Sequence, residues 1–275
     1  MIEPNFSESQ LQQVVNTEIT IQSFLHTGKM YNPTVVNLIE EYNLGWDTAF
    51  YFPWLLKTPH PKHRGCNFFI QYKLSELVEG SRGNEYSSWG CSYLRFKIPY
   101  LTKNETTGKY IYDYNQFDRL KELADEGYYT YYATNHILFD YQLFRLADSQ
   151  QLLDEIPFLD VSSIIGYHPK VTFTERSLYF LLHSDAKKID IVRWEQIFAS
   201  VRKIKGTALS EDVKYINEFL IRAEEKLEFS KERGFLYEKA KISQVTQPLR
   251  PVAEALIAAK YLRLYLNVDW YKVWE

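Results

Sequence analysis

The segment from Cys66 to Leu74, CNFFIQYKL, constrains the fold most strongly, because it places Gln71 and Lys73 inside an apolar run. The run is rich in aromatic residues and follows Gly65, which is typical of a buried β-strand. Side chains alternate between the two faces of a strand, so we expect Gln71 and Lys73 to share one face. Burying an unpaired ammonium is costly, so Lys73 requires a partner or a function.

A second apolar segment, Leu44 to Phe52 (LGWDTAFYF), presents the same problem with the opposite charge. Asp47 stands among aromatic and small apolar residues, where a free carboxylate is as costly as a free ammonium. Placing Asp47 and Lys73 on adjacent strands resolves both problems. The result is either an ion pair or a metal site with a charged neighbour.

A short helix is expected immediately before the Asp47 strand. Asn32 and Pro33 are suited to the cap and first position of a helix. Glu40 and Glu41 follow on that helix about 100° apart, so at most one of them faces the site. Glu18, in an earlier helix or turn over residues 17–26, is a further candidate acid. A solvated charge at a helix start is the favoured interpretation of Glu18.

The order of helix Glu, strand Asp and Gln-x-Lys strand resembles the PD-(D/E)XK, or restriction-endonuclease-like, nuclease superfamily. The resemblance covers roughly residues 18–173, and the run IQYKLSE at 70–76 is similar to uncharacterised bacterial members associated with anti-phage defence. It implies an α/β (α+β) fold with a central mixed sheet flanked by helices. Two departures stand out. Gly45-Trp46 replaces the Pro that often precedes the Asp, and Gln71 replaces an acid.

The resemblance also implies a metal-dependent endonuclease that hydrolyses phosphodiester bonds, most often of DNA. Asp47, Gln71, Lys73 and Glu41 then correspond to the catalytic set. Asp47, Glu41 or Glu40, and the backbone carbonyl of Tyr72 would bind Mg²⁺ or Mn²⁺, ions that prefer oxygen ligands. In this family the lysine orients or activates the attacking water.

Contacts to nucleic acid require a local basic patch, because the chain has a net charge of −3. The loop between the two strands offers such a patch, with exposed charges that merely maintain solubility as the alternative. A third expected strand, Tyr93 to Pro99, presents two cations on one face. The candidate contacts are Lys57, His60, Lys62, His63, Arg64, Arg95 and Lys97.

The remaining pattern predicts a helix over 113–126, a strand over 128–134 and helices at roughly 189–199, 211–233 and 251–266. We therefore expect a nuclease-like core over residues 1–174 and a helical extension over 175–275. The Asp47 strand, the Gln71/Lys73 strand and the strands at 93–99 and 128–134 are expected in one sheet. His168 is interpreted as a structural histidine.

Other features limit the function class. The chain has two cysteines and lacks a long apolar run or signal-peptide pattern, so we expect a cytoplasmic protein without membrane contact. The resemblance implies DNA, a homodimer and a partner protein of a defence system as partners. The alternative function is a catalytically silent binding module for nucleic acid or protein, in which Asp47 and Lys73 form a structural ion pair.

Overall fold

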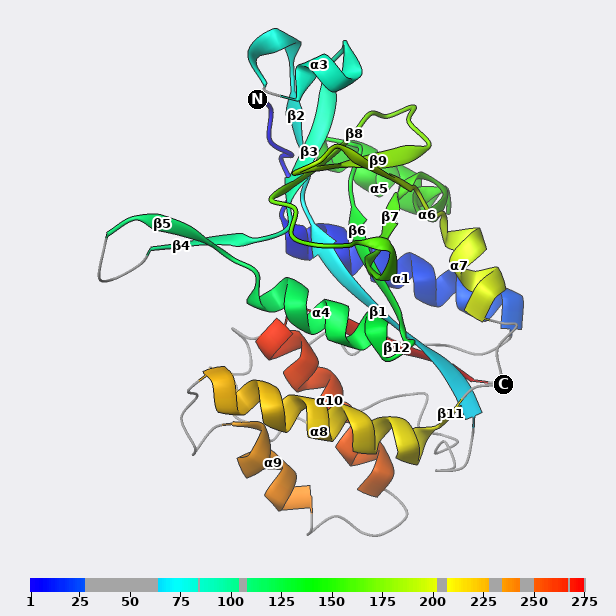
Figure 1. Cartoon of the computed structure of the whole chain (residues 1–275). Coiled ribbons are helices and arrows are strands. Elements are labelled where there is room, and N and C mark those ends of the chain that lie inside the picture. The colour runs from blue at the N-terminus through cyan, green and yellow to red at the C-terminus, as the bar shows by residue number, and fades with distance from the viewer. Residues whose placement is uncertain are drawn as a thin grey trace. The chain divides into compact units, whose positions relative to one another are not determined.

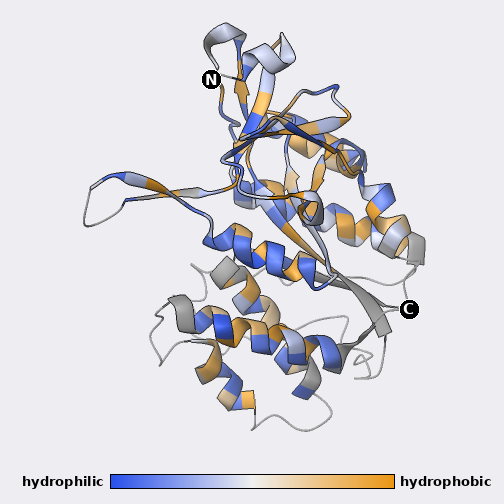
Figure 2. Ribbon diagram, viewed as in Figure 1, coloured by the Kyte–Doolittle hydropathy of each residue, from blue (hydrophilic) through white to orange (hydrophobic). Residues whose placement is uncertain are grey.

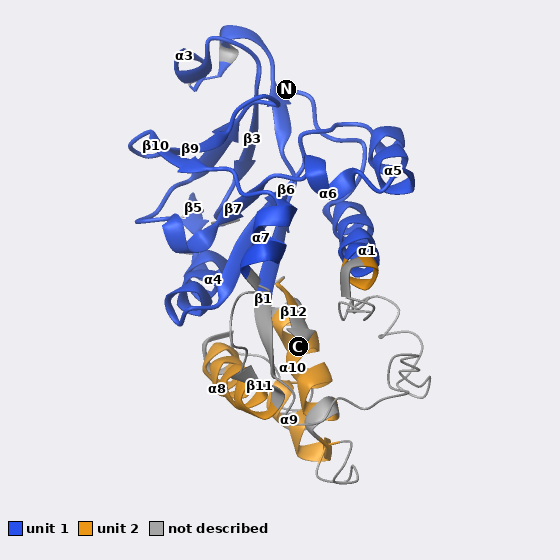
Figure 3. Cartoon of the chain, turned by 90° about the vertical axis from the view of Figure 1, so that its right-hand side faces the viewer, with its two compact units in different colours: residues 1–22, 68–200 blue, residues 23–67, 201–275 orange. Residues whose placement is uncertain are grey.

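The structure, a computed structural model, describes residues 1–27, 64–83, 85–103, 108–201, 207–227, 234–242, 250–266 and 268–274. These residues form a mixed α/β fold (Figure 1). The expected fold class is therefore confirmed as a mixture of helices and sheets. The chain divides into two compact units (Figure 3). Unit 1 holds residues 1–22 and 68–200, and unit 2 holds residues 23–67 and 201–275.

The first sheet of unit 1 is built on β1 (Arg64–Lys73), the strand predicted at Cys66 to Leu74. β6 (Tyr129–Thr134) runs parallel to β1, and β7 (Phe158–Asp160) pairs antiparallel with β6. Parallel neighbours need a crossover connection, and that connection includes α4 (Asn115–Asp125), which packs against β6. The β1 and β6 predictions are confirmed, as is the intervening helix.

The second sheet of unit 1 is antiparallel, in the order β10-β9-β8-β3-β2. Its strands are β2 (Glu76–Val78), β3 (Tyr93–Lys97), β8 (Lys170–Phe173), β9 (Tyr179–His183) and β10 (Lys187–Asp190). Phe96 on β3 contacts Tyr132 on β6, with ring centroids 6.2 Å apart, so the inner faces of the two sheets share a core.

The expectation of one sheet holding the strands at 66–74, 93–99 and 128–134 is therefore wrong. β3 pairs with β2 and β8, whereas β1 pairs with β6. Alternation along a strand fixes which side chains share a face, but it carries no information about which strand lies next to it. The neighbours of β3 are set by the short connection from β1 into β2.

Helices contact the face of the first sheet that carries Phe68 and Tyr72. The long helix α1 (Glu8–Thr27) contacts β1 through Asn16 and Tyr72. α5 (Asp140–Asp148) and α6 (Leu152–Glu155) lie between β6 and β7 in the chain. α7 (Trp194–Val201) brings Trp194 against Phe68, with ring centroids 5.7 Å apart.

Short elements complete unit 1. They are the 3-10 turns η2 (Gly80–Arg82) and η3 (Val161–Ser163), the helix α3 (Tyr86–Trp89), and the strands β4 (Tyr100–Lys103) and β5 (Tyr110–Asp113). β4 and β5 form an antiparallel ribbon that projects away from the two sheets of unit 1 (Figure 1). α4, by contrast, lies on the unit with its apolar residues Phe117, Leu120 and Leu123 buried and a hydrophilic outer face (Figure 2).

Unit 2 is mainly helical, with α8 (Leu209–Leu227), α9 (Phe235–Lys241) and α10 (Arg250–Leu266). Phe235 packs on Tyr261, and Lys260 forms an ion pair with Glu238 at 2.9 Å. Two strands, β11 (Thr207–Ala208) and β12 (Asp269–Trp274), pair with β1, whose residues 64–67 belong to this unit. The helix predicted at 251–266 is confirmed, and the one predicted at 211–233 is confirmed as far as Leu227, since residues 228–233 lie outside the described residues.

The segment 175–200 differs from the expected start of the helical extension. It contains β9 and β10 before α7, and it belongs to unit 1. Phe180 and Leu182 point into the core, and the two strands form a hairpin through Lys187 and Leu182. Leu178 to Leu182 form an uninterrupted apolar run, and periodicity alone does not distinguish a short run of this kind in a strand from one in a helix. None of the helices in the described part of the chain has the length and apolar character that crossing a bilayer requires.

Candidate active site

Gln71 and Lys73 lie together on one face of β1, as the strand periodicity predicts. Gln71 is fully buried and Lys73 is 5 % exposed. Their partners in the register with β6 are Tyr132 and Thr134. This face therefore looks toward the core shared with the second sheet, and it carries a lysine at the carboxyl end of the strand.

Lys73 lies beside the beginning of α4. Its Nζ donates a hydrogen bond to Oε1 of Gln116, the second residue of that helix, at 3.2 Å. At the start of the helix the Asn115 N–H donates a hydrogen bond to Asp113 Oδ1 at 2.9 Å, a local turn that Asp side chains favour. The ammonium of Lys73 thus lies near the positive end of the helix dipole.

Tyr72 points to the opposite face of β1. Its hydroxyl donates a hydrogen bond to Asn16 Oδ1 on α1 at 2.6 Å, and both residues are buried. α1 consequently covers the Tyr72 face, whereas α4 meets the Lys73 face. An acidic side chain on α1 therefore lies on the Tyr72 side of β1 and not on the side of Lys73.

Glu18 does not reach the Lys73 face, because it lies on α1. It is 2 % exposed and accepts a hydrogen bond from Gln22 Nε2 at 3.1 Å. Burial raises the pKa of Glu18, the Gln22 hydrogen bond lowers it, and the charge of Asp154 raises it. The interpretation of Glu18 as a solvated charge at a helix start is wrong, since α1 begins at Glu8 and buries Glu18.

The remaining predicted metal ligands lie outside the described residues, as does most of the basic loop. These are Glu40, Glu41, Asp47, Lys57, His60, Lys62 and His63. Arg64 opens β1, where its Cα pairs with Ala208. Within the described ranges, no group of three or more His, Cys, Asp and Glu residues is arranged to hold a metal ion.

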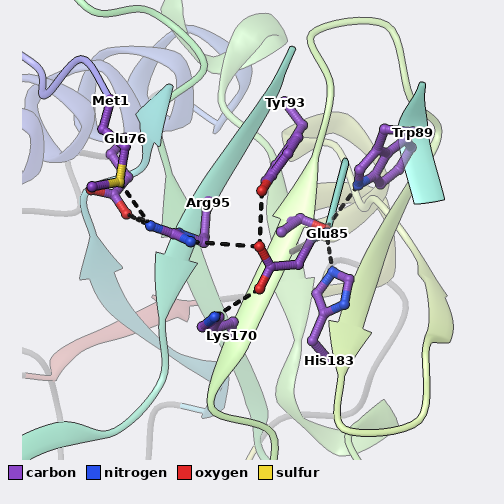
Figure 4. Close-up of polar contacts among 9 residues, drawn as sticks. Met1, Glu76, Glu85, Trp89, Tyr93, Arg95, Lys170 and His183 are labelled. Atoms are coloured by element: carbon purple, nitrogen blue, oxygen red, sulfur yellow. Dashed lines mark hydrogen bonds and ion pairs between the residues drawn. The ribbon is translucent and has the colours of Figure 1, made fainter. Parts of the chain in front are cut away.

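Arg95 and Lys97 lie on β3 in the second sheet, on the face opposite the shared core. Arg95 Nε donates to Glu76 Oε1 at 2.9 Å, and its Nη1 lies 3.5 Å from Glu85 Oε2 (Figure 4). Arg95 is therefore already engaged by two carboxylates. Lys97 is exposed and has Lys170 as its register partner on β8.

A polar network that the sequence patterns do not predict is centred on Glu85 in unit 1. Glu85, 5 % exposed, accepts hydrogen bonds from Tyr93 Oη at 2.8 Å and from Lys170 Nζ at 2.7 Å. Burial raises the pKa of Glu85, but the hydrogen bonds from Lys170 and Tyr93 outweigh it and lower that pKa to about 2. Burial and the hydrogen bond to Glu85 raise the pKa of Tyr93 to about 12. The network fastens the loop before α3 to the sheet.

Histidines near this network are structural. Thr172 Oγ1 lies 2.6 Å from His183 Nε2 and accepts a hydrogen bond from Trp89 Nε1 (Figure 4). Burial lowers the pKa of His183. His168 is 2 % exposed, with Nε2 2.9 Å from the Ile165 carbonyl and Nδ1 3.0 Å from Ser184 Oγ. The structural interpretation of His168 is confirmed.

A second buried network joins the carboxyl ends of β1 and β6. Asn135 Oδ1 accepts the Ser75 N–H at 2.8 Å, and Asn135 Nδ2 donates to the carbonyls of Ser75 and Ile137. The hydroxyls of Ser75 and Thr134 lie 2.6 Å apart. All of these side chains are buried, so the end of β1 next to Lys73 is held firmly.

A cleft of about 330 Å³ lies elsewhere in unit 1. Leu77, Tyr93 and Leu94 of the second sheet line it, with residues 136–139 after β6 and Gln142 of α5. Gln71 and Lys73 are not part of its lining. The cleft and the candidate site are therefore separate features.

Comparisons with protein-family models, curated proteins and solved structures found no match to this chain. The resemblance to the restriction-endonuclease-like superfamily therefore rests on the residues quoted above.

Proposed function

We propose that this protein is a metal-dependent nuclease that hydrolyses phosphodiester bonds of DNA, in the setting of anti-phage defence that the run at 70–76 suggests. One observation carries the proposal. Lys73 is buried at the carboxyl end of a strand parallel to its neighbour, on the same face as Gln71 and beside the N-terminus of α4.

Lys73 is the cation that would meet an anion at this site. The ammonium and the N-terminal end of α4 both carry positive charge, which the carboxylates of Asp113 and Asp118 at the start of α4 partly offset, and helix N-termini commonly bind phosphate groups. A phosphodiester held there would accept a hydrogen bond from Lys73. In the transition state Lys73 would stabilise the additional negative charge, an effect that contributes a few kcal/mol in enzymes.

Mg²⁺ or Mn²⁺ fits the residue types proposed for the site. The buried Gln71 supplies an amide oxygen, and Asp47 with Glu41 or Glu40 would supply the carboxylates that such ions require. One neutral oxygen from Gln71 is insufficient by itself, so Asp47 is essential to the proposal. The bound ion would polarise the phosphate and lower the pKa of a water molecule.

A specific observation favours the second candidate, a silent binding module. Gln71 is neutral at the position that carries an acid in the nucleases this chain resembles, and Lys73 already donates to the neutral amide of Gln116. In that case Lys73 and Asp47 would contribute to folding, and the protein would bind nucleic acid or a partner protein without cleaving it.

Cleavage of supercoiled plasmid in Mg²⁺ or Mn²⁺ tests the proposal. The parent should nick or linearise the plasmid, and EDTA should stop the reaction. Lys73→Met keeps the aliphatic stem but removes the charge, and it should lower the rate by about a hundredfold or more. Lys188→Ala, an exposed lysine on β10, is the matched control and should cleave like the parent. An inactive parent, or an equally active Lys73→Met, would refute the proposal.

A further inference from the structure

The β4–β5 ribbon carries an exposed surface that the candidate site does not explain. Tyr110 is 70 % exposed, and Leu101 and Tyr112 are each 50 % exposed. Figure 1 shows the ribbon projecting from unit 1, and Figure 2 shows apolar residues along it. Apolar residues on a projecting element with little to cover them are typical of a binding surface.

One face of the ribbon combines aromatic residues with positive charge. In the antiparallel register Leu101 is opposite Tyr112 and Lys103 is opposite Tyr110, so these four side chains share a face. Lys103 is exposed. Asp113 is the acid among the described ribbon residues, and it lies on the other face, bonded to the N–H of Asn115. The aromatic face is therefore cationic.

The root of the ribbon is continuous with the candidate active site. Tyr112 contacts Tyr114, and Tyr114 packs on Phe117 of α4, with both pairs of ring centroids 6.3 Å apart. Gln116, two residues after Tyr114, accepts the hydrogen bond from Lys73. A polymer gripped by the ribbon would therefore pass close to Lys73.

From these features we infer that the β4–β5 ribbon is a DNA-gripping element that lies in the major groove of a duplex. The inference rests on the proposed function for the choice of substrate. The major groove is about 12 Å wide and admits a two-stranded ribbon, whose strands lie about 4.8 Å apart. Lys103 would contact a phosphate, while Tyr110, Tyr112 and Leu101 would contact sugars and base edges, including thymine methyl groups.

Charge decides between DNA and a second copy of the chain. Two copies joined through this face would place two Lys103 charges of the same sign in one interface, which is unfavourable. The phosphates of a duplex are complementary to the same charge. Duplex DNA is therefore the occupant that the face fits.

The test is fluorescence anisotropy of a labelled duplex in EDTA, so that binding is measured without cleavage. Lys103→Ala should weaken binding and reduce the slope of log affinity against log salt by about one. Lys103→Ala combined with Tyr110→Ala should weaken binding about tenfold or more. Both side chains are exposed, so melting temperatures should equal that of the parent. Lys188→Ala and Tyr141→Ala, a lysine and an exposed tyrosine outside the ribbon, should bind like the parent.

Unchanged duplex affinity in the ribbon variants would overturn the inference. A parent dimer that the same variants convert to monomers would also overturn it, because the ribbon would then join two copies. Tighter binding of single strands or of RNA through the ribbon would overturn the groove assignment. If the parent binds DNA through the ribbon but does not cleave it, the nuclease proposal alone is refuted. If the ribbon variants cleave DNA at the rate of the parent, this inference alone is refuted.

Discussion

Replacing Gly83 with alanine should break the buried hydrogen bond between Tyr93 and Glu85. A Cβ at Gly83 would overlap Tyr93 Oη and lie 2.9 Å from Val78 Cγ1. The backbone at Gly83, with φ −90° and ψ 141°, is accessible to any residue, so the effect is steric. Tyr93 is 1 % exposed and Val78 is 3 % exposed, which leaves neither side chain an easy way to move aside.

The magnitude follows from two contributions. A hydrogen bond to a charged group contributes about 1.5–3 kcal/mol, and Tyr93 would lose its bond to the Glu85 carboxylate. Inserting a methyl group into a tightly packed site costs about 1–3 kcal/mol. Gly83→Ala should therefore lower the free energy of unfolding by about 2–5 kcal/mol.

Urea denaturation of the parent, Gly83→Ala, Tyr93→Phe and the double variant measures whether the two substitutions affect stability through the same hydrogen bond. Tyr93→Phe alone should cost about 1.5–3 kcal/mol, because it removes the same hydrogen bond. The double variant should cost at least about 1 kcal/mol less than the sum of the single variants, since the bond is lost only once. Ser87→Ala, at an exposed position of α3, should have little effect. A parent-like Gly83→Ala, or strict additivity, would refute the steric account.

Two further predictions concern the buried networks. The folded-state pKa of Glu85 is about 2, below its ordinary value of 4.5, so its stabilising contribution is present above pH 4.5 and is lost as the pH falls toward 2. Between pH 5 and 2 the parent should therefore lose more stability than Glu85→Gln does, as acid titration of thermal melts would show. Equal pH dependence would contradict the assignment. Asn135→Ala removes three hydrogen bonds from a fully buried site and should cost at least about 3 kcal/mol in urea denaturation, whereas a cost below 1 kcal/mol would show that the network contributes little.

Local patterns were sufficient to predict several elements. β1 and β6 are apolar, aromatic runs, and α4 and α10 have apolar residues at helical spacing. The shared face of Gln71 and Lys73 follows from the period of a strand alone. These features depend on neighbouring residues in the chain, which is why the sequence is informative about them.

Those local patterns do not predict contacts between residues that are far apart in the sequence. Glu85 meets Lys170, which is 85 positions away, and Tyr72 meets Asn16, which is 56 positions away. The burial of Glu18 depends on the way in which α1 packs, and the neighbours of β3 depend on the path between the two sheets. A charged residue in a polar stretch of sequence gives no sign that a distant partner will neutralise it.

The most direct test of a metal site built on β1 is Mn²⁺ binding by calorimetry, combined with thermal melts of Asp47→Ala and Lys73→Met. We predict that the parent and Lys73→Met bind Mn²⁺, that Asp47→Ala does not, and that both variants melt close to the parent without metal. A parent that binds no Mn²⁺, together with variants destabilised by about 3–5 kcal/mol, would contradict this and show that Asp47 and Lys73 form a structural ion pair.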